Sequence, residues 1–241
     1  MLQSQVSVAE LFPLGDCEDP APALLGLPAP GIATLVAGLP LQRRRVRAKQ
    51  CLFRAGERRQ SLFLIHAGCF KTCVNSPDGR EKVTGFRLRG DLLGMDALGT
   101  PRYTCNAISL DVGEVWELPV AHLRDSLPEF QQQLTAVLAS EIRRDWGWML
   151  AVGTLSAEQR VITFLLDLAT RFEAQGFSAR CLMLRMTRAD LGNFLALQLE
   201  TVTRALSRLQ ALGLIGVERR QIRIEDPIGL RAMLGVTRSL H

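Results

Sequence analysis

Length, composition and charge restrict the class of protein to which this chain can belong. The chain has 241 residues, of which 47% are hydrophobic and 22% charged, values typical of one large or two ordinary globular domains. Its N-terminus carries no early cluster of positive charge, and no apolar run is long enough to cross a bilayer, so neither secretion nor membrane contact is expected. Six cysteines without a CxxC pair are too few for a disulfide scaffold, and we expect a reduced, cytoplasmic protein.

The net charge of +5 is concentrated at the C-terminal end of the chain. From residue 180 onward the sequence has ten arginines and five acidic residues, an excess that equals the net charge of the whole chain. Guanidinium groups suit phosphate and guanine because they donate paired hydrogen bonds in a fixed plane. A solvated, arginine-rich face is the alternative interpretation. The regional imbalance favours nucleic-acid binding at this end.

The first half of the chain predicts a β-rich domain behind an N-terminal arm. Residues 1–40 are rich in Pro, Ala and Gly, with one brief helical pattern near residues 31–37, and we interpret them as an arm that packs loosely. Between residues 41 and 119, short β-forming segments such as 62–65 alternate with glycines. The string NSPDG at residues 75–79 is a strong turn signal, because proline presets φ and glycine accepts a positive φ. The pattern predicts a compact β-barrel or roll.

A long helical pattern follows from Val120, with a break or a new first turn expected at Pro128. Apolar residues recur in it at steps of three and four, which places them on one face of a helix, as in a core or an interhelical seam. Asp145 in this face either lies at its solvent-exposed edge, or its carboxylate must be paired, protonated or repelled by Asp145 of a second copy of the chain. The predicted seam residues are Leu134, Leu138, Ile142, Asp145 and Met149.

The C-terminal part predicts a winged helix-turn-helix. A capping box at Ser156 to Gln159 opens one helix, which closes near Gly176, and Thr187 with Asp190 opens a second. Residues 186–224 then give two short helices, a tight connection and a basic hairpin. Ala196 stands at the turn, where glycine would avoid a strained conformation, and Gln198 is a poor N-cap. The second helix carries side chains able to read base edges on one face: Glu200, Thr203 and Arg204.

Three stretches resemble the CRP/FNR superfamily of bacterial transcription regulators, on its FNR-like side: LFRAGERRQSLFLIHAG, VTGFRLRGDLLGMDALG and TRADLGNFLALQLETVTRALSRLQALGLI. The resemblance covers roughly Lys49 to Arg238. It implies an α+β fold with an N-terminal β-roll of the cyclic-nucleotide-binding jelly-roll type, a long dimerisation helix and a C-terminal winged helix-turn-helix. The implied domains are the arm (1–40), the β-roll sensor (41–119), the dimerisation helix (120–152) and the DNA-binding domain (153–241).

The resemblance also implies how DNA is read. FNR-like proteins carry a Glu-x-x-Ser-Arg pattern that reads TTGAT half-sites, and Glu200, Thr203 and Arg204 match it with Thr in place of Ser. Leu199 stands where the cAMP-responsive branch has a further reading Arg, which favours FNR-type specificity. An ordinary surface pair between Glu200 and Arg204 is the alternative interpretation. The expected phosphate contacts are Arg188, Arg208, Arg219, Arg220 and Arg223.

The family's usual cofactors are not expected here. Cyclic-nucleotide binders have Gly-Glu where this chain has Gly94 and Met95, and an Arg-Ser pair where residues 103–106 contain no Arg. The FNR [4Fe-4S] cluster needs three clustered N-terminal cysteines and a distant one, whereas this chain offers Cys17 in the arm and Trp116 at the distant position.

Other groups could bear a signal. His66 is a weak candidate haem ligand, since a lone strand histidine is more often structural. Cys69 and Cys73 are a candidate redox pair, or part of an unidentified metal site with Cys51 or Cys105, although buried free cysteines usually act as small hydrophobic residues. The activating signal, ligand or metal is not apparent from the sequence.

The sequence therefore predicts a non-enzymatic transcription regulator, an activator or a dual regulator, that binds TTGAT-like inverted repeats in double-stranded DNA as a homodimer. RNA polymerase is the partner that the resemblance implies, with Ser76 to Arg80 as a candidate contact loop. FNR-like proteins also place an Asp at the position of Asp145, which implies a dimer weakened by repulsion. The alternatives are a redox- or haem-dependent sensor or enzyme, and a protein-interaction module that has lost DNA binding.

Overall fold

The computed structural model describes residues 41–121 and 128–235. The predicted N-terminal arm, including the brief helix near residues 31–37, lies outside the described residues. Within the described chain two compact units form, and the boundary between them falls between Ala139 and Ser140, inside one helix. We call residues 41–121 and 128–139 the β-roll unit, and residues 140–235 the winged-helix unit.

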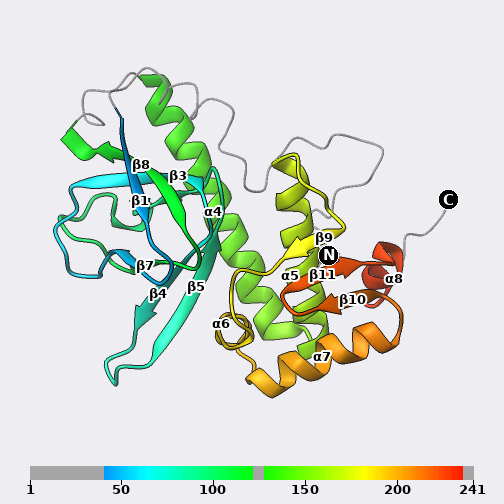
Figure 1. Cartoon of the computed structure of the whole chain (residues 1–241). Helices are drawn as coiled ribbons and strands as arrows, with labels where there is room; N and C mark the ends of the chain where they lie inside the picture. The colour runs from blue at the N-terminus through cyan, green and yellow to red at the C-terminus, as the bar shows by residue number, and fades with distance from the viewer. Residues whose placement is uncertain (1–40, 122–127, 236–241) are drawn as a thin grey trace, which may run out of the picture. The chain divides into compact units, whose positions relative to one another are not determined.

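The β-roll unit contains two four-stranded antiparallel sheets (Figure 1). The first has the order β1-β8-β3-β6 and consists of β1 (Gln42–Val46), β8 (Gly113–Pro119), β3 (Ser61–Ala67) and β6 (Leu92–Leu93). The second has the order β2-β7-β4-β5 and consists of β2 (Cys51–Phe53), β7 (Asn106–Ser109), β4 (Phe70–Asn75) and β5 (Glu81–Arg87). The 3-10 helix η1 (Met95–Ala97) follows β6. The roll predicted from the sequence is confirmed.

The turn between β4 and β5 has the geometry that its sequence predicts. Gly79 has φ 82°, a value that favours glycine, and its N–H donates to the carbonyl of Ser76 at 2.8 Å. The N–H of Ser76 donates to the carbonyl of Arg80 at 2.9 Å and closes the loop. The NSPDG string thus fixes the hairpin register locally, before any long-range packing.

Apolar side chains fill the interior of the β-roll. The aromatic rings of Phe53 and Tyr103 stack with centroids 3.9 Å apart, and the Tyr103 hydroxyl donates to the buried carbonyl of Ser61 at 2.7 Å. Each fully buried large side chain contributes roughly 1.5 to 3 kcal/mol from the removal of its surface from water. The cluster also contains Phe63, Ile65, Phe70, Leu93, Cys105 and Val115.

The long helix α4 (Pro128–Thr154) begins at the predicted new first turn. In the β-roll unit, its residues Leu134, Val137 and Leu138 pack half-buried against a second apolar cluster that includes Leu62 and Leu118. Further along α4 the predicted seam residues are exposed: Ile142 by 49% and Met149 by 69%, with Asp145 exposed between them. The face inferred from periodicity therefore packs against the β-roll at Leu134 and Leu138 and is exposed to solvent from Ile142 onward.

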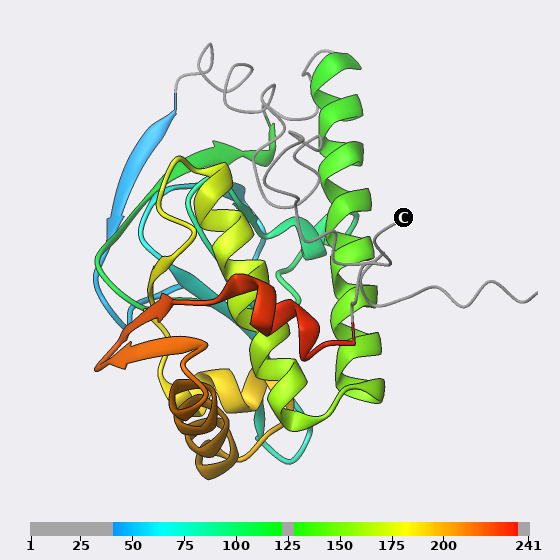
Figure 2. The same ribbon diagram turned by 90° about the vertical axis from the view of Figure 1, so that its right-hand side faces the viewer.

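The winged-helix unit contains four further helices and a three-stranded antiparallel sheet of order β10-β11-β9. In chain order the elements are α5 (Ala157–Ala174), β9 (Cys181–Met183), α6 (Arg188–Leu195), α7 (Leu199–Ala211), β10 (Ile215–Glu218), β11 (Gln221–Ile224) and α8 (Pro227–Ala232). Figure 2 shows α7, in orange-brown, nearly along its axis and next to β10, which it contacts. The predicted capping box at Ser156 and the glycine stop at Gly176 are both confirmed.

The end of α4 packs onto α5 and α6 within the winged-helix unit. The indole ring of Trp148 meets the ring of Phe194 on α6 edge to face, with centroids 4.9 Å apart, and the ring of Phe164 on α5 at 6.2 Å. Beside these rings, the buried Arg144 Nη2 lies 3.4 Å from the buried Asp167 Oδ2. A buried ion pair adds little net stability, but removal of one partner is costly because the other charge stays buried.

Candidate DNA-binding surface

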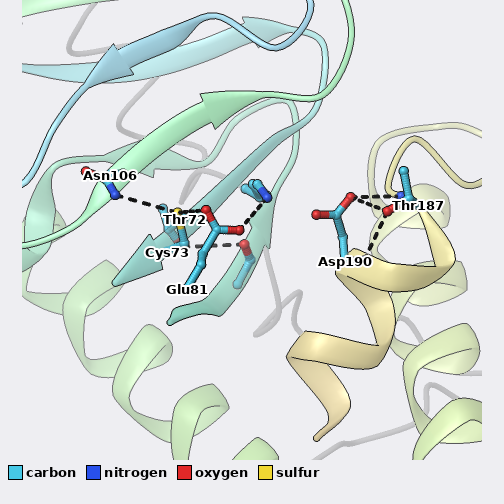
Figure 3. Close-up of polar contacts among 8 residues, drawn as sticks. Thr72, Cys73, Glu81, Asn106, Thr187 and Asp190 are labelled. Atoms are coloured by element: carbon cyan, nitrogen blue, oxygen red, sulfur yellow. Dashed lines mark hydrogen bonds and ion pairs between the residues drawn. The ribbon is translucent and has the colours of Figure 1, made fainter. Parts of the chain in front are cut away.

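The first helix of the helix-turn-helix is fixed at its start by a reciprocal cap. The Thr187 hydroxyl accepts from the Asp190 N–H at 3.0 Å, and the Asp190 carboxylate accepts from the Thr187 N–H at 3.1 Å (Figure 3). Two N–H groups that have no intrahelical partner are thereby satisfied. The start predicted from the Thr-x-x-Asp spacing is confirmed.

The turn between α6 and α7 depends on two small residues. Ala196 adopts φ 55° and ψ 46°, the left-handed conformation expected at this position, at a cost of roughly 1 to 2 kcal/mol for a residue other than glycine. Gly192 allows the turn to approach α6: a Cβ built on it would lie 2.7 Å from the carbonyl oxygen of Leu197. Sequence reasoning missed Gly192, although an isolated glycine inside a helical pattern is itself a signal of close packing.

Helix α7 buries one face and exposes the other. Val202, Leu206 and Leu209 are 0 to 2% exposed and hold the helix on the rest of the unit. Glu200 and Arg204 are exposed and Thr203 is half-buried, and the steps of three and four place these three side chains on a common face. Gln198 provides no side-chain cap, as its residue type predicts. The burial of the apolar face orients the polar face toward solvent.

Of the three predicted base-reading side chains, Thr203 and Arg204 form local hydrogen bonds and Glu200 is exposed. The Arg204 guanidinium donates to the Thr201 hydroxyl at 3.4 Å, and the structure shows no ion pair between Glu200 and Arg204 in this well-described helix. The Thr203 hydroxyl donates to the carbonyl of Leu199 at 3.0 Å and accepts from Arg188 Nη1 at 3.4 Å. Arg188 thus connects the first helix of the motif to the second.

The five predicted phosphate-contacting arginines differ in how they are held. Arg208 Nε lies 3.3 Å from Glu158, and Arg223 lies 3.0 Å from Glu218 and 3.6 Å from Glu225. Arg219 and Arg220 form the exposed turn between β10 and β11, and Arg219 adopts φ 55° there. Within the residues that the structure describes, no ion pair engages these two arginines. The tip of the wing therefore presents two cations to solvent.

The comparisons with known proteins agree with this geometry. A model of the Crp-like helix-turn-helix domain matches residues 159–233, and a model of the cyclic nucleotide-binding domain matches residues 43–129. The chain is 36% identical over 202 residues to the fumarate and nitrate reduction regulatory protein of Salmonella typhimurium, with 83% of this chain and 81% of that protein covered. It is 37% identical over 195 residues to the transcriptional activator protein FnrA of Stutzerimonas stutzeri, with 80% of each covered.

The chain belongs to the Crp/FNR family. Among solved structures, it is similar to FixK2 from Bradyrhizobium japonicum, with a TM-score of 0.74 and 28% identity over 80% of this chain and 97% of that one. By name, the first of these relatives is a regulatory protein and the second a transcriptional activator. The resemblance inferred from three sequence stretches is thus confirmed, as is the α+β arrangement of β-roll, long helix and winged helix-turn-helix.

The positions at which Crp/FNR proteins would hold a cyclic nucleotide contain apolar or already bonded groups in this chain. Met95 is only 8% exposed and lies in the core cluster beside Leu62, and the Tyr103 ring is buried in the aromatic stack. Arg102, the arginine nearest in sequence, donates to the carbonyl of Gly56 at 2.6 Å. Met95 and Tyr103 themselves supply neither a carboxylate for a ribose nor a cation for a phosphate, so these two positions do not match the pairs expected of a cyclic-nucleotide binder.

The position of the distant cluster ligand in FNR-type proteins is filled by an indole ring. Trp116 on β8 stacks on His66 with centroids 5.0 Å apart and an interplanar angle of 17°, and the Arg43 guanidinium lies 6.0 Å from the indole. An indole provides no thiolate for iron, so this position does not fit a four-cysteine cluster. His66 Nε2 lies 3.9 Å from Glu114, and its role as a haem ligand stays a prediction. Cys17 lies outside the described residues.

The candidate redox cysteines are buried thiols. Cys73 donates to Glu81 Oε2 at 3.3 Å, and Glu81 Oε1 also accepts from Lys71 Nζ at 2.7 Å (Figure 3). Burial, and secondarily the neighbouring Glu81, raise the pKa of the Cys73 thiol to about 11, and burial raises the pKa of Cys105 as well. Cys69 is buried too. A raised pKa opposes the thiolate that redox chemistry requires, and the redox role stays a prediction.

Residues 41–121 and 128–235 contain no group of three or more His, Cys, Asp or Glu side chains placed to hold a metal ion. No described helix combines the length and the apolar character that a membrane span requires.

Proposed function

We propose that this Crp/FNR protein binds TTGAT-like inverted repeats in double-stranded DNA as a homodimer and activates, or both activates and represses, transcription. The observation that carries the proposal is the face of α7, where Glu200, Thr203 and Arg204 lie together above a fully buried apolar face. An α-helix with this polarity fits the major groove, where each base pair presents a distinct pattern of donors and acceptors.

Each side chain of this face has a matching base group. The Arg204 guanidinium forks onto guanine O6 and N7, and the Glu200 carboxylate accepts from a cytosine amino group. Thr203 faces a thymine. Arg219 and Arg220, exposed at the tip of the wing, contact phosphates and supply affinity that falls as salt rises. Phosphate contacts position the protein, while the three residues of α7 choose the sequence.

The homodimer is supported by the exposed apolar face of α4. Ile142, Trp146 and Met149 are 49%, 57% and 69% exposed and follow one another at steps of four and three along the helix. The predicted seam runs through Ile142, Asp145 and Met149 and passes over Trp146, which sequence reasoning therefore missed. Burial of these side chains against a second copy would remove most of their apolar surface from water.

Asp145 lies within this face and makes the dimer sensitive to electrostatics. Its exposed carboxylate would approach that of the second copy across the interface and weaken association. Asp145→Ala is expected to tighten the dimer, by roughly 5- to 10-fold in dissociation constant for a relief of about 1 kcal/mol or slightly more. Sedimentation equilibrium measures this constant; an unchanged value would show that Asp145 does not oppose association.

RNA polymerase is the proposed protein partner, with the hairpin tip at Ser76 to Arg80 as a contact. The tip is exposed, and an ion pair between Arg80 Nε and Asp78 Oδ2 at 2.6 Å orders its charged groups. An exposed, ordered loop between two paired strands is a common form of protein-binding element.

The proposal is tested by fluorescence anisotropy with a labelled duplex that carries a TTGAT inverted repeat. Arg204→Ala is expected to weaken binding by roughly 5- to 150-fold for each half-site, the value of a lost bidentate guanine contact of about 1 to 3 kcal/mol. Arg44→Ala, which removes an exposed arginine from strand β1 of the β-roll unit, is the matched control and should bind as the unmodified protein does. Absence of binding both with and without oxygen would favour a sensor enzyme or an interaction module instead.

A further inference from the structure

Thr203 is the residue at which this recognition helix departs from the Ser of the FNR-type pattern, and its side chain offers two different groups to a base. One is the hydroxyl, which Ser shares, and the other is the methyl, which Ser lacks. In the major groove a thymine presents the O4 acceptor and the C5 methyl. The structure distinguishes between these two ways of reading thymine.

The hydroxyl proton of Thr203 is already used inside the helix. A hydroxyl has a single O–H to donate, and that of Thr203 donates to the carbonyl of Leu199 at 3.0 Å. The same bond to the carbonyl four residues earlier is made by the helical threonines at 135, 154, 163 and 170, at 2.8 to 3.1 Å. It is therefore the ordinary state of a helical threonine in this chain and requires no special arrangement at residue 203.

Arg188 engages the hydroxyl oxygen from the other side. Its Nη1 donates to Thr203 Oγ1 at 3.4 Å, and Arg188 is itself placed by the Thr187 cap, as the first residue of α6. The guanidinium keeps four further N–H groups, so a phosphate contact by Arg188 is compatible with this bond. With its proton donated to Leu199 and an acceptor position taken by Arg188, the hydroxyl can donate to thymine O4 only by giving up its side-chain bond to the Leu199 carbonyl.

We infer that Thr203 reads thymine through its methyl group, by van der Waals contact with the thymine C5 methyl, and that Arg188 is a positioning residue that holds the Thr203 hydroxyl. The inference rests on the proposed DNA-binding function and specifies one of its base contacts. Thr in place of Ser then adds an apolar contact to thymine that Ser lacks.

Uracil provides the test, because it differs from thymine only by the absence of the C5 methyl. Each thymine of the TTGAT inverted repeat is replaced in turn by deoxyuridine, symmetrically in both half-sites, and binding is measured by anisotropy. One position should bind about fourfold more weakly for each half-site, the effect of one buried methyl group. If every uracil duplex binds as the thymine duplex does, the inference is overturned.

Two substitutions identify the protein group that contacts this methyl. Thr203→Ser keeps the hydroxyl and its bonds but removes the methyl, so it should bind the thymine and uracil duplexes equally. Thr203→Val keeps methyl groups and removes the hydroxyl, so it should still prefer thymine. A Ser variant that prefers thymine as strongly as the unmodified protein does would contradict the methyl contact, and so would a Val variant that shows no preference.

The preference for the thymine duplex over the uracil duplex also measures the role of Arg188. Arg188→Gln should lower both the affinity and the preference for thymine over uracil, because the side chain of Thr203 loses one of its two restraints. Arg220→Gln, on the wing, is the control and should lower the affinity for both duplexes by the same factor. A full preference in Arg188→Gln would exclude the positioning role. Failure to bind any duplex would refute the proposed function itself, whereas equal binding of thymine and uracil refutes only this inference.

Discussion

The two units of this protein differ in how their functional positions are occupied. In the winged-helix unit the polar residues of the motif lie on the surface, each on an element whose opposite face is buried. In the β-roll unit the positions that correspond to the family's cofactor contacts are filled by Met95, Tyr103 and Trp116, all of which pack against other side chains. The winged-helix unit thus combines a Crp-like helix-turn-helix domain with an exposed polar face, whereas these three positions of the β-roll unit are occupied by packed side chains.

This difference shows that a protein can share the fold of its relatives without sharing the residues of their ligand sites. The β-roll matches the model of a cyclic nucleotide-binding domain, and its fold depends on alternating apolar residues and on glycines at turns. A ligand site depends on a few polar groups that the fold does not require. Substitution of such groups by apolar side chains is compatible with an intact roll.

The largest effect is expected from the buried ion pair of the winged-helix unit. Asp167→Ala removes the carboxylate nearest to the buried Arg144, which keeps Glu141 Oε1 at 3.8 Å, and should destabilise the unit by about 3 to 5 kcal/mol. Hydrogen exchange read by mass spectrometry separates the two units and should show faster exchange in residues 140–235 only. Equal acceleration in the β-roll strands would mean that the two units unfold together.

A smaller effect is expected from the glycine that lets the turn approach α6. Gly192→Ala places a Cβ 2.7 Å from the Leu197 carbonyl and should cost about 1 to 3 kcal/mol in urea unfolding. Gly153→Ala is the matched control on α4, since a Cβ there meets nothing within 4 Å, and should stabilise by about 0.5 to 1 kcal/mol. Equal effects of both substitutions would show that the close approach at Gly192 is unimportant.

The smallest effect near neutral pH concerns the thiols, and it compares the buried β-roll with the exposed wing. The folded pKa of Cys73, about 11, lies above its ordinary value of 9.0, so the fold favours the protonated thiol. The stability that this provides is present below about pH 9 and is lost as the pH rises through about 11. In native protein at pH 8, iodoacetamide should label the exposed Cys181 roughly a hundredfold faster than Cys73, as measured by peptide mapping. Comparable rates would show that the roll opens readily.

Features set by neighbouring residues in the sequence could be predicted. The caps at Ser156 and Thr187 and the turn at Gly79 follow from the intrinsic preferences of a few consecutive residues. The polar face of α7 follows in the same way from steps of three and four. The predicted residues of this face lie together in the structure because one helix carries all of them.

Features that depend on contacts between distant residues could not be predicted. Periodicity placed Leu134 and Leu138 on the same face as Met149, but it cannot show that the first two pack on the β-roll of their own chain. The pairing of Arg144 with Asp167 joins residues 23 positions apart, and neither residue signals its partner. The hydrogen bond from Arg188 to Thr203 likewise requires the turn between α6 and α7 to be in place.

The boundary between the two units lies inside α4, and this limits how the molecule can be divided. A fragment that begins at Ser140 would start in mid-helix and leave the first four N–H groups of the shortened helix without their intrahelical acceptors. It would keep Arg144 and Trp148, which pack on α5 and α6, but it would lose the turns of α4 that precede them. Removal of the β-roll at this boundary, by a protease or by truncation of the gene, would therefore fray the helix that adjoins the DNA-binding part.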